Sequence, residues 1–316
     1  MLDSLRFVQG AVAKKDFVPS LTHFRIQGGT IRGFNGMLAL CCPIDVNLDC
    51  SPKALPFVKA IQTCKDTIQL HLTQAGRLSV KSGKFKALVD CIPDEYPSVE
   101  PEGVVMPLNG ELLKVLKLLT PFIADDASRP WARGILLRGQ SAFATNNIVL
   151  IERWLGYTFP VELNIPRSAV VEMIRIGEEP ERLQICENSV TFHFSGNRWL
   201  RTQTYSTQWP DIGRILDKPA NPLAIPDGLW EAAADLAPFV DELGRLFLSN
   251  GMVTTGHGEG AGASIEVPGI LDNGCFNVQQ VMLLKGVAKT IDMTGYPGPC
   301  AFFGDKIRGA LVGMRV

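Results

Sequence analysis

The chain has 316 residues, 46% of them apolar, and a formal net charge of −1. This length and composition predict two or three folded domains and exclude a disordered chain. The nearly neutral charge excludes a protein that is basic over its whole surface, although it is compatible with one basic patch. No apolar run reaches the roughly 20 residues that span a bilayer, and the N-terminal segment lacks the basic start of a secretory signal.

The eight cysteines follow no CxxC spacing, and Cys41 and Cys42 are adjacent. This pattern is typical of reduced, mostly buried thiols and favours neither a disulfide framework nor a zinc site. We therefore expect a cytoplasmic protein that holds no metal and no other cofactor.

Helix and strand patterns alternate along the chain. The segments that read as helices are 2–15, 51–64, 109–123, 165–177, 226–240 and 275–290. In the third of these, Leu112, Val115 and Leu119 recur at helical spacing. Asn109 precedes them and can cap the helix start. Stretches that alternate apolar and polar residues, such as TIQLHL and SVTFHFS, follow the helices and predict strands.

One phrase occurs twice at the same length. A Ser-Gly pair, a polar residue, an alternating stretch and an aromatic-Pro pair occupy residues 82–97 and again 195–210. A weaker third copy has its Gly-polar pair at residues 304–305. We interpret the chain as three copies of a helix-strand-helix-strand unit, joined by short linkers that fix their arrangement. The predicted domains are residues 1–103, 104–220 and 221–316.

Basic residues gather on the predicted helices, although the whole chain is slightly acidic. Lys114 and Lys117 lie opposite the apolar stripe of their helix, and Arg167 and Arg175 lie opposite the stripe of theirs. Segment 227–241 is the exception, because it has acidic residues and neither Lys nor Arg. The cations are either ordinary solvated helix faces or the lining of a site for a polyanion.

The order of motifs resembles that of the bacterial DNA polymerase sliding clamps, the processivity subunits of the replicase. ATNNIVLIE stands where the family has Ala-Thr-Asp-Gly-His-Arg-Leu-Ala, and TQWPDIGRIL resembles Phe-Pro-Asp-Tyr-Arg-Arg-Val. CFNVQQVMLL resembles the family's Phe-Asn-x-x-Tyr-Leu helix, and the terminal VGMRV resembles Met-Pro-Met-Arg-Leu. Each motif is weak alone, but their order covers nearly the whole chain.

The resemblance implies an α+β fold of three repeated clamp domains, each with two helices packed on antiparallel sheets, arranged as an arc or half ring. Two chains would then close a homodimeric ring around double-stranded DNA, and helix cations would attract its phosphates without reading sequence. The resemblance implies a binding protein without enzymatic activity, cofactor or membrane partner. The expected DNA-facing residues are Arg6, Lys14, Lys15, Lys53, Lys59, Lys114, Lys117, Arg129, Arg167, Arg175, Lys285 and Lys289.

The resemblance also implies a hydrophobic cleft that captures short Gln-x-x-aliphatic-aromatic tails of the replicative polymerase and the clamp loader. Aliphatic walls and an adaptable methionine suit this role. An ordinary edge strand is the less favoured alternative for residues 312–316. The expected cleft residues are Thr145, Asn147, Leu150, Pro210, Arg214, Ile215, Val312, Met314, Arg315 and Val316.

The sequence departs from the family pattern in several places. Asn147, Ile148 and Val149 replace Gly-His-Arg, which removes a typical imidazole and a typical cation from the cleft, and Gly313 replaces a proline. The sequence starts at the first helix, without the family's leading strand, and its third domain is short, as in a divergent clamp of phage or mobile-element type. The alternative function is therefore a clamp-fold protein that binds polymerase or loader partners without encircling DNA.

Two further motifs suggest other functions. GHGEGAG at 256–262 superficially matches a phosphate-binding loop, but no Lys-Ser/Thr follows, and a hairpin fits the segment better. Cys186 and His193 are close in sequence, but neither a partner carboxylate nor a nucleophile-elbow pattern accompanies them. The sequence therefore favours a protein that is not an enzyme.

Overall fold

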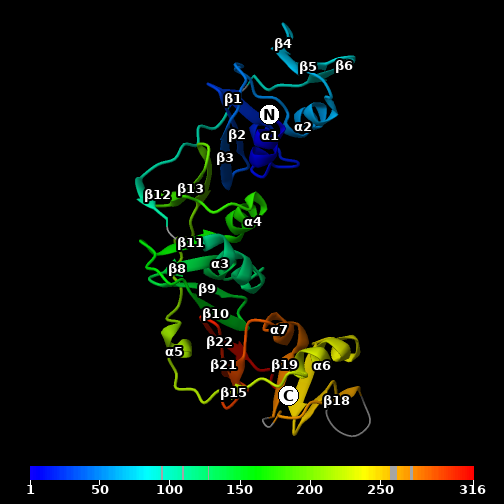
Figure 1. Ribbon diagram of the computed structural model, residues 1–316, viewed down its shortest axis with the longest axis vertical. Helices are drawn as coiled ribbons and strands as arrows, with labels where there is room; N and C mark the ends of the chain where they lie inside the picture. The colour runs from blue at the N-terminus through cyan, green and yellow to red at the C-terminus, as the bar shows by residue number, and fades with distance from the viewer. Residues whose placement is uncertain (94, 109, 127, 257–261, 271–272) are drawn as a thin grey trace. The chain divides into compact units, whose positions relative to one another are not determined.

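The structure is a computed structural model that describes residues 1–93, 95–108, 110–126, 128–256, 262–270 and 273–316 (Figure 1). Its chain forms two compact units. The first unit comprises Met1–Leu113 and Ile165–Tyr205, and the second comprises Lys114–Asn164 and Ser206–Val316. Within the described residues, no helix combines the length and apolarity that crossing a membrane would require.

The first unit contains a seven-stranded antiparallel sheet and a separate three-stranded one. The larger sheet has the order β1 (Phe24–Gln27), β2 (Thr30–Phe34), β3 (Leu38–Pro43), β14 (Arg198–Gln203), β13 (Ser189–Phe194), β12 (Arg182–Cys186) and β7 (Val104–Pro107). The smaller sheet consists of β4 (Gln69–Leu72), β5 (Leu78–Ser82) and β6 (Phe85–Val89). Because β3 pairs with β14, residues more than a hundred positions apart share one sheet, with Leu40 opposite Leu200.

Three helices belong entirely to the first unit: α1 (Leu2–Gln9), α2 (Ala54–Thr63) and α4 (Arg167–Ile176). Helix α1 packs on β2 and β3 and also contacts α2. It buries Leu5, Phe7 and Val8, which lie on one face of the helix. Apolar burial of this kind explains why a helix of only eight residues is stable here, since so short a helix is marginal in water.

The second unit contains an eight-stranded antiparallel sheet and a four-stranded one. The larger has the order β11 (Leu163–Pro166), β8 (Gly134–Arg138), β9 (Ser141–Thr145), β10 (Val149–Trp154), β22 (Ile307–Val312), β21 (Pro299–Gly304), β20 (Thr290–Asp292) and β15 (Leu223–Ala224). The smaller has the order β18 (Ser264–Glu266), β17 (Met252–Thr254), β16 (Arg245–Ser249) and β19 (Gly274–Asn277). The pairing of β10 with β22 again joins distant parts of the sequence, with Glu152 opposite Arg308.

The helices of the second unit are α5 (Gly213–Leu216), α6 (Leu229–Leu236) and α7 (Val278–Leu283). Helix α3 (Leu112–Leu119) and strand β11 straddle the boundary between the units. Short 3₁₀ turns occupy Pro19–Thr22, Thr120–Phe122, Pro130–Arg133 and Ala237–Phe239.

The repeated Ser-Gly phrase is confirmed as a recurring hairpin. Its turn joins β5 to β6, β13 to β14 and, in the weaker third copy, β21 to β22. The turns use left-handed backbone at Gly83, Gly196 and Lys306, each with φ between 54° and 66°. The two compact units cut across the middle predicted domain, so the three-domain division stays a prediction.

Every predicted helix is present, but each is shorter than its sequence pattern. The largest difference concerns 275–290, where only Val278–Leu283 is α-helical and Gly274–Asn277 is strand β19. The Asn277 side chain accepts hydrogen bonds from the backbone N–H groups of Gln279 and Gln280 and so fixes the helix start. The helix prediction for Lys285 and Lys289 is therefore wrong, because both lie beyond the end of α7. Asn109 and most of 256–262 lie outside the described residues.

Candidate functional site

The second unit carries an open, mostly apolar groove with an empty volume of about 760 Å³. It lies where the β9–β10 hairpin, the segment around α5 and the strands β21 and β22 come together (Figure 1). The described residues that line it are Arg129, Trp131, Thr145, Asn147, Ile148, Leu150, Pro210, Ile212, Ile215, Pro299, Ala310 and Val312. Of these, Arg129 alone bears a formal charge, so the groove suits a ligand that is mainly apolar.

A cluster of buried side chains supports the groove from beneath: Leu136, Phe143, Leu150, Trp209, Ile212 and Leu216. Trp131 and Ile215 pack against this cluster from the groove side. The rings of Trp131 and Trp209 meet edge to face, with centroids 5.0 Å apart, which is a favourable arrangement for two aromatic rings. The groove wall is therefore continuous with the hydrophobic core and is held rigidly in shape.

The rim of the groove is the tight turn between β9 and β10. The Thr145 hydroxyl donates to the Val149 carbonyl at 2.8 Å and accepts from the Asn147 N–H at 3.0 Å. The Asn146 side chain accepts from the Val149 N–H at 2.8 Å. Asn147 has φ 75°, in the left-handed region where glycine is easiest and asparagine is the next best tolerated. This geometry explains why Asn147 can stand where the clamp pattern has glycine.

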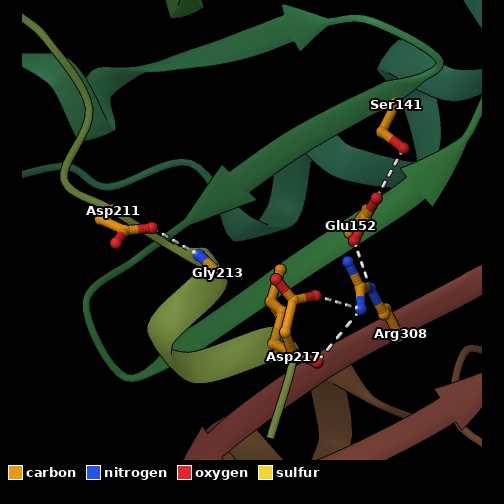
Figure 2. Close-up of polar contacts among 7 residues, drawn as sticks. Ser141, Glu152, Asp211, Gly213, Asp217 and Arg308 are labelled. Carbon is orange, nitrogen blue, oxygen red and sulfur yellow. Dashed lines mark hydrogen bonds and ion pairs between the residues drawn. The ribbon is translucent and has the colours of Figure 1, made fainter.

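Helix α5 forms another wall, and carboxylates flank its first residue. The Asp211 side chain accepts from the Gly213 N–H at 3.2 Å, at the start of the helix (Figure 2). A Cβ on Gly213 would lie 2.8 Å from Oδ2 of Asp217, so a larger residue there would displace that carboxylate. The sequence showed a clamp-like phrase at this point but did not predict a helix.

One arginine fastens α5 to the sheet. Arg308 on β22 donates from Nε to Glu152 on β10, and from Nη1 to the Asp217 carboxylate at 2.8 Å and the Leu216 carbonyl at 3.1 Å (Figure 2). The Glu152 side chain is only 13% exposed and also accepts from the Ser141 hydroxyl at 2.6 Å. Because an unpaired carboxylate in such a place is costly, the Arg308 contacts should hold the α5 wall in position.

Most of the expected cleft residues come together. Thr145, Asn147, Leu150, Pro210, Ile215 and Val312 all line the groove. Arg214 points away from it into solvent and pairs with Asp211 at 3.2 Å.

The last three residues of the chain, Met314, Arg315 and Val316, are not among the described residues that line the groove. The Met314 N–H donates to the Cys275 carbonyl at 2.7 Å, and its own carbonyl accepts from the Tyr296 hydroxyl at 2.7 Å. Val316 lines a different hollow, beside Tyr296. These backbone hydrogen bonds draw the end of the chain towards β19, so the structure does not support the expectation that all three contribute to the cleft.

Sequence reasoning missed several groove residues. Trp131, Pro299 and Ala310 come from segments that meet the others only in the folded unit, whereas Ile148 and Ile212 lie inside the two clamp-like phrases but were not selected. Arg129 was expected to face DNA, but it lines the groove, and its Nη1 donates to Oδ1 of Asn147 at 3.0 Å. Nothing in the local sequence pattern around Arg129 distinguishes a DNA-facing side chain from one that lines the groove.

The expected DNA-facing cations occupy varied surroundings. Arg6 on α1, Lys59 on α2, and Lys114 and Lys117 on α3 are exposed on helices. Exposed cations beyond helix ends are Lys14, Lys15, Lys53, Lys285 and Lys289. Lys289 pairs with both carboxylate oxygens of Asp305 at 2.8 Å, and this hydrogen-bonded ammonium lowers the pKa of Asp305. Arg167 is half-buried at the start of α4.

Arg175 differs most from its expected role. Its Nε donates to both carboxylate oxygens of Glu172, at 2.9 and 3.0 Å, and its Nη2 donates to the Phe7 carbonyl at 2.7 Å. The Glu172 side chain is only 8% exposed and fits against Gly10, where a Cβ would collide with it. Arg175 therefore joins α4 to the end of α1 and is not the freely solvated cation that its helical position predicts.

No protein-family model and no curated protein matches the sequence. Solved structures match it throughout, each over 100% of this chain and 97% of the other. They include the beta sliding clamp of C. crescentus, with a TM-score of 0.86 and 18% identity, and the sliding clamp (DNA polymerase III subunit beta) of Bartonella birtlesii, with 0.85 and 16%. The DNA polymerase sliding clamp of Bacillus subtilis gives 0.82 and 16%. The expected fold class is confirmed: the chain has the α+β fold of the bacterial beta sliding clamps.

Proposed function

We propose that this chain is a DNA sliding clamp. In this proposal two copies form a ring around double-stranded DNA, without sequence preference, and tether a replicative polymerase for processive synthesis in the cytoplasm. The observation that carries the proposal is the likeness to sliding clamps over 100% of this chain and 97% of theirs. Because the likeness runs over nearly the full length of both chains, it supports a role that uses the whole fold, and the proposed role needs no catalytic group.

The groove supports the tethering part of the proposal. Its walls are aliphatic and aromatic, and the polar side chains among its described lining residues are those of Thr145 and Asn147 at the turn and Arg129 at the rim. Such a surface fits a short peptide that presents an aliphatic and an aromatic side chain, as a polymerase or clamp-loader tail would. Peptides of this kind bind through a few buried anchors, so a small groove is sufficient.

The exposed lysines on α2 and α3 support the DNA-binding part. Lys59 and Lys117 project from helices whose opposite faces are buried, which leaves their ammonium groups in water. Ammonium groups attract phosphates at a distance and do not read bases, which permits sliding. Arg175 and Lys289 do not belong to this proposed set, since both are engaged by carboxylates of the chain itself.

Topological retention is the direct test. The purified protein is assembled on a nicked circular plasmid and separated from free protein by gel filtration, and half of the sample is then linearised with a restriction enzyme. A clamp stays with the circle and is lost from the linear DNA, and light scattering gives twice the mass of one chain.

Equal retention on both forms of the DNA would contradict encirclement. A monomer that binds a polymerase tail peptide but is never retained on circles would instead support the alternative, a clamp-fold protein that binds such partners without enclosing DNA.

A further inference from the structure

Two cysteines of the first unit lie side by side on adjoining backbone segments. Cys50 forms a bridge with Ile26 of β1, through Ile26 N–H to Cys50 carbonyl at 2.9 Å and Cys50 N–H to Ile26 carbonyl at 3.1 Å. Two residues further on, Pro52 is paired with Cys91. Because side chains two residues apart in an extended segment share a face, Cys50 and Cys91 project from the same side of this ladder.

The two thiols lie on the same face and differ in exposure. Cys50 is 6% exposed, whereas Cys91 is partly exposed, and the Cys91 thiol donates to the Val89 carbonyl at 3.8 Å. Both line an open hollow beside the ladder, together with Arg25, Gly76 and Tyr96. The buried thiol therefore lies beside a thiol that solvent reaches, which is the arrangement of a reactive cysteine with a second cysteine near it.

The surroundings of Cys91 favour its thiolate. The neighbouring Cys50 thiol lowers the pKa of Cys91 to about 7, although burial acts in the opposite direction, and the Leu78 backbone adds to the lowering. In contrast, burial raises the pKa of Cys41, Cys42 and Cys275. Since the thiolate is the nucleophile in thiol chemistry, Cys91 should react before these buried cysteines.

We propose that Cys50 and Cys91 form a peroxide-reactive dithiol that closes to a disulfide. The Cys91 thiolate attacks one oxygen of a hydroperoxide, the O–O bond breaks, and the products are a Cys91 sulfenic acid and hydroxide, or alkoxide from an organic peroxide. The Cys50 sulfur then attacks the sulfenic sulfur, an S–S bond forms, and hydroxide leaves and takes up the Cys50 proton as water. The two thiols are oxidised by two electrons and the peroxide is reduced, so no other co-reactant is needed.

The disulfide would link a segment next to the three-stranded sheet to a segment next to the seven-stranded sheet of the first unit. Cys91 follows β6 of the three-stranded sheet, whereas Cys50 is bridged to β1 of the seven-stranded sheet and precedes α2. Between the two cysteines the chain forms α2 and the whole three-stranded sheet. Oxidation would therefore close a long loop, which restricts the unfolded chain and raises stability when the native geometry accepts the bond.

The test uses the full-length reduced protein and hydrogen peroxide. After each time point the remaining thiols are blocked with iodoacetamide, and mass spectrometry follows intact mass and cross-linked peptides. We expect the loss of two hydrogens and one peptide pair that joins Cys50 to Cys91. Cys91 should be consumed roughly fivefold faster than an unperturbed thiol at pH 7, since its larger thiolate fraction outweighs its lower nucleophilicity.

Serine variants separate the two roles. In Cys50→Ser the sulfenic acid on Cys91 should accumulate and be trapped by dimedone, whereas Cys91→Ser should abolish the fast phase. Cys64→Ser is the matched control, because Cys64 is also partly exposed and, like Cys91, donates to a backbone carbonyl, that of Ala60 at 3.2 Å. It is not among the described residues that line the hollow shared by Cys50 and Cys91, so this variant should behave as the parent protein.

Circular dichroism of each variant establishes that it is folded. The proposal is overturned if Cys91 reacts no faster than Cys64. It is equally overturned if a folded parent protein keeps the Cys91 sulfenic acid without forming the Cys50–Cys91 cross-link.

Discussion

Each unit contains an arginine paired with a nearly buried glutamate, and the two pairs do different work. In the first unit Arg175 binds Glu172 three residues before it on α4 and also caps the Phe7 carbonyl on α1. In the second unit Arg308 binds Glu152 on the neighbouring strand and reaches Asp217 at the end of α5. The first pair joins two helices, whereas the second holds one wall of the groove.

The two pairs show that the position of a cation on a helix or strand does not establish whether it is available to bind another molecule. Arg175 lies on the polar side of a predicted helix, yet its guanidinium is occupied by the chain itself. Arg308 lies in a strand and belongs to no motif in the sequence, yet its contacts hold one wall of the groove. The role of each arginine depends on the carboxylates and carbonyls it contacts, and the fold brings those groups to it.

The largest expected effect is on the first pair. Arg175→Ala should lower the free energy of unfolding by about 2–3 kcal/mol, because it leaves the Glu172 carboxylate buried without its partner. Urea denaturation measures this. Arg6→Ala is the matched control, since Arg6 also faces an acid three residues away, Asp3, but both are exposed, and it should change the same quantity by less than about 0.5 kcal/mol. Equal losses of unfolding free energy in Arg175→Ala and Arg6→Ala would refute the distinction between the buried and the exposed pair. Glu172→Gln in the Arg175→Ala background should restore part of the lost stability.

The second pair should respond through binding more than through stability. Arg308→Ala is expected to cost about 1–2 kcal/mol of folding stability and to weaken binding of an aliphatic-aromatic peptide roughly tenfold, since the α5 wall loses its anchor. Fluorescence anisotropy of a labelled peptide measures the affinity. Arg138→Ala serves as the control, because it removes an exposed pair with Glu162 in the same sheet. Unchanged peptide affinity in Arg308→Ala would show that the wall does not depend on this arginine.

The solvated lysines Lys59 and Lys117 should affect DNA retention and not stability, in contrast to Arg175. Lys59→Glu together with Lys117→Glu should reduce the salt dependence of DNA retention, by a slope of about 0.9 for each lost phosphate contact, and leave the urea midpoint unchanged. The measurement is retention on nicked circles across a salt series. Lys81→Glu, at an exposed position on β5, is the control and should not change the slope. A drop in stability of the double variant, without a change in slope, would count against a DNA-facing role.

The smallest effect concerns a partly exposed ion pair between Arg198 on β14 and Glu178, beside Phe7 of α1. Arg198 lies 5.2 Å from the centroid of the Phe7 ring and donates to Glu178, which lowers the pKa of Glu178. Because the folded pKa is lowered, this pair stabilises the fold above the ordinary glutamate pKa of about 4.3, and the contribution disappears as the pH falls through the folded pKa. Glu178 is largely exposed, so the contribution should stay below about 1 kcal/mol.

Thermal unfolding between pH 3 and pH 7 tests this last prediction. Glu178→Gln should flatten the acid side of the stability profile relative to the parent protein. An identical acid slope in the two proteins would show that the Arg198 contact contributes nothing measurable.

Much of the fold was predictable because it depends on residues that are near one another in the sequence. The apolar spacing in 109–120 and 165–177 predicts helices, and the Ser-Gly phrase predicts the hairpins at Gly83 and Gly196, since left-handed turn residues are required there. The helix ends were not predicted, because packing and capping decide them, as Asn277 shows for α7. The pairing of β3 with β14 and of β10 with β22 is not written locally either, since each pairing joins strands distant in sequence.

The candidate groove shows the same limit. Thr145, Asn147 and Leu150 were found because they belong to one continuous clamp-like phrase, as were Pro210 and Ile215 in another. Trp131, Pro299 and Ala310 have no distinguishing neighbours, and only the sheet order brings them to the same surface. Met314–Val316 were expected in the groove on the basis of the resemblance, but they are not among its described lining residues, and the backbone of Met314 is hydrogen-bonded to Cys275 and Tyr296.

By itself the sequence determined the alternation of helices and hairpins, the repeated turn and the resemblance to a clamp, because these depend on residues near one another along the chain. Only the tertiary structure decided which charges are available and which side chains share a surface. Arg129 at the groove rim, Arg175 between two helices, and the neighbouring positions of Cys50 and Cys91 all depend on partners distant in sequence or on burial. Burial and non-local pairing arise only when the chain has folded, so no local pattern encodes them.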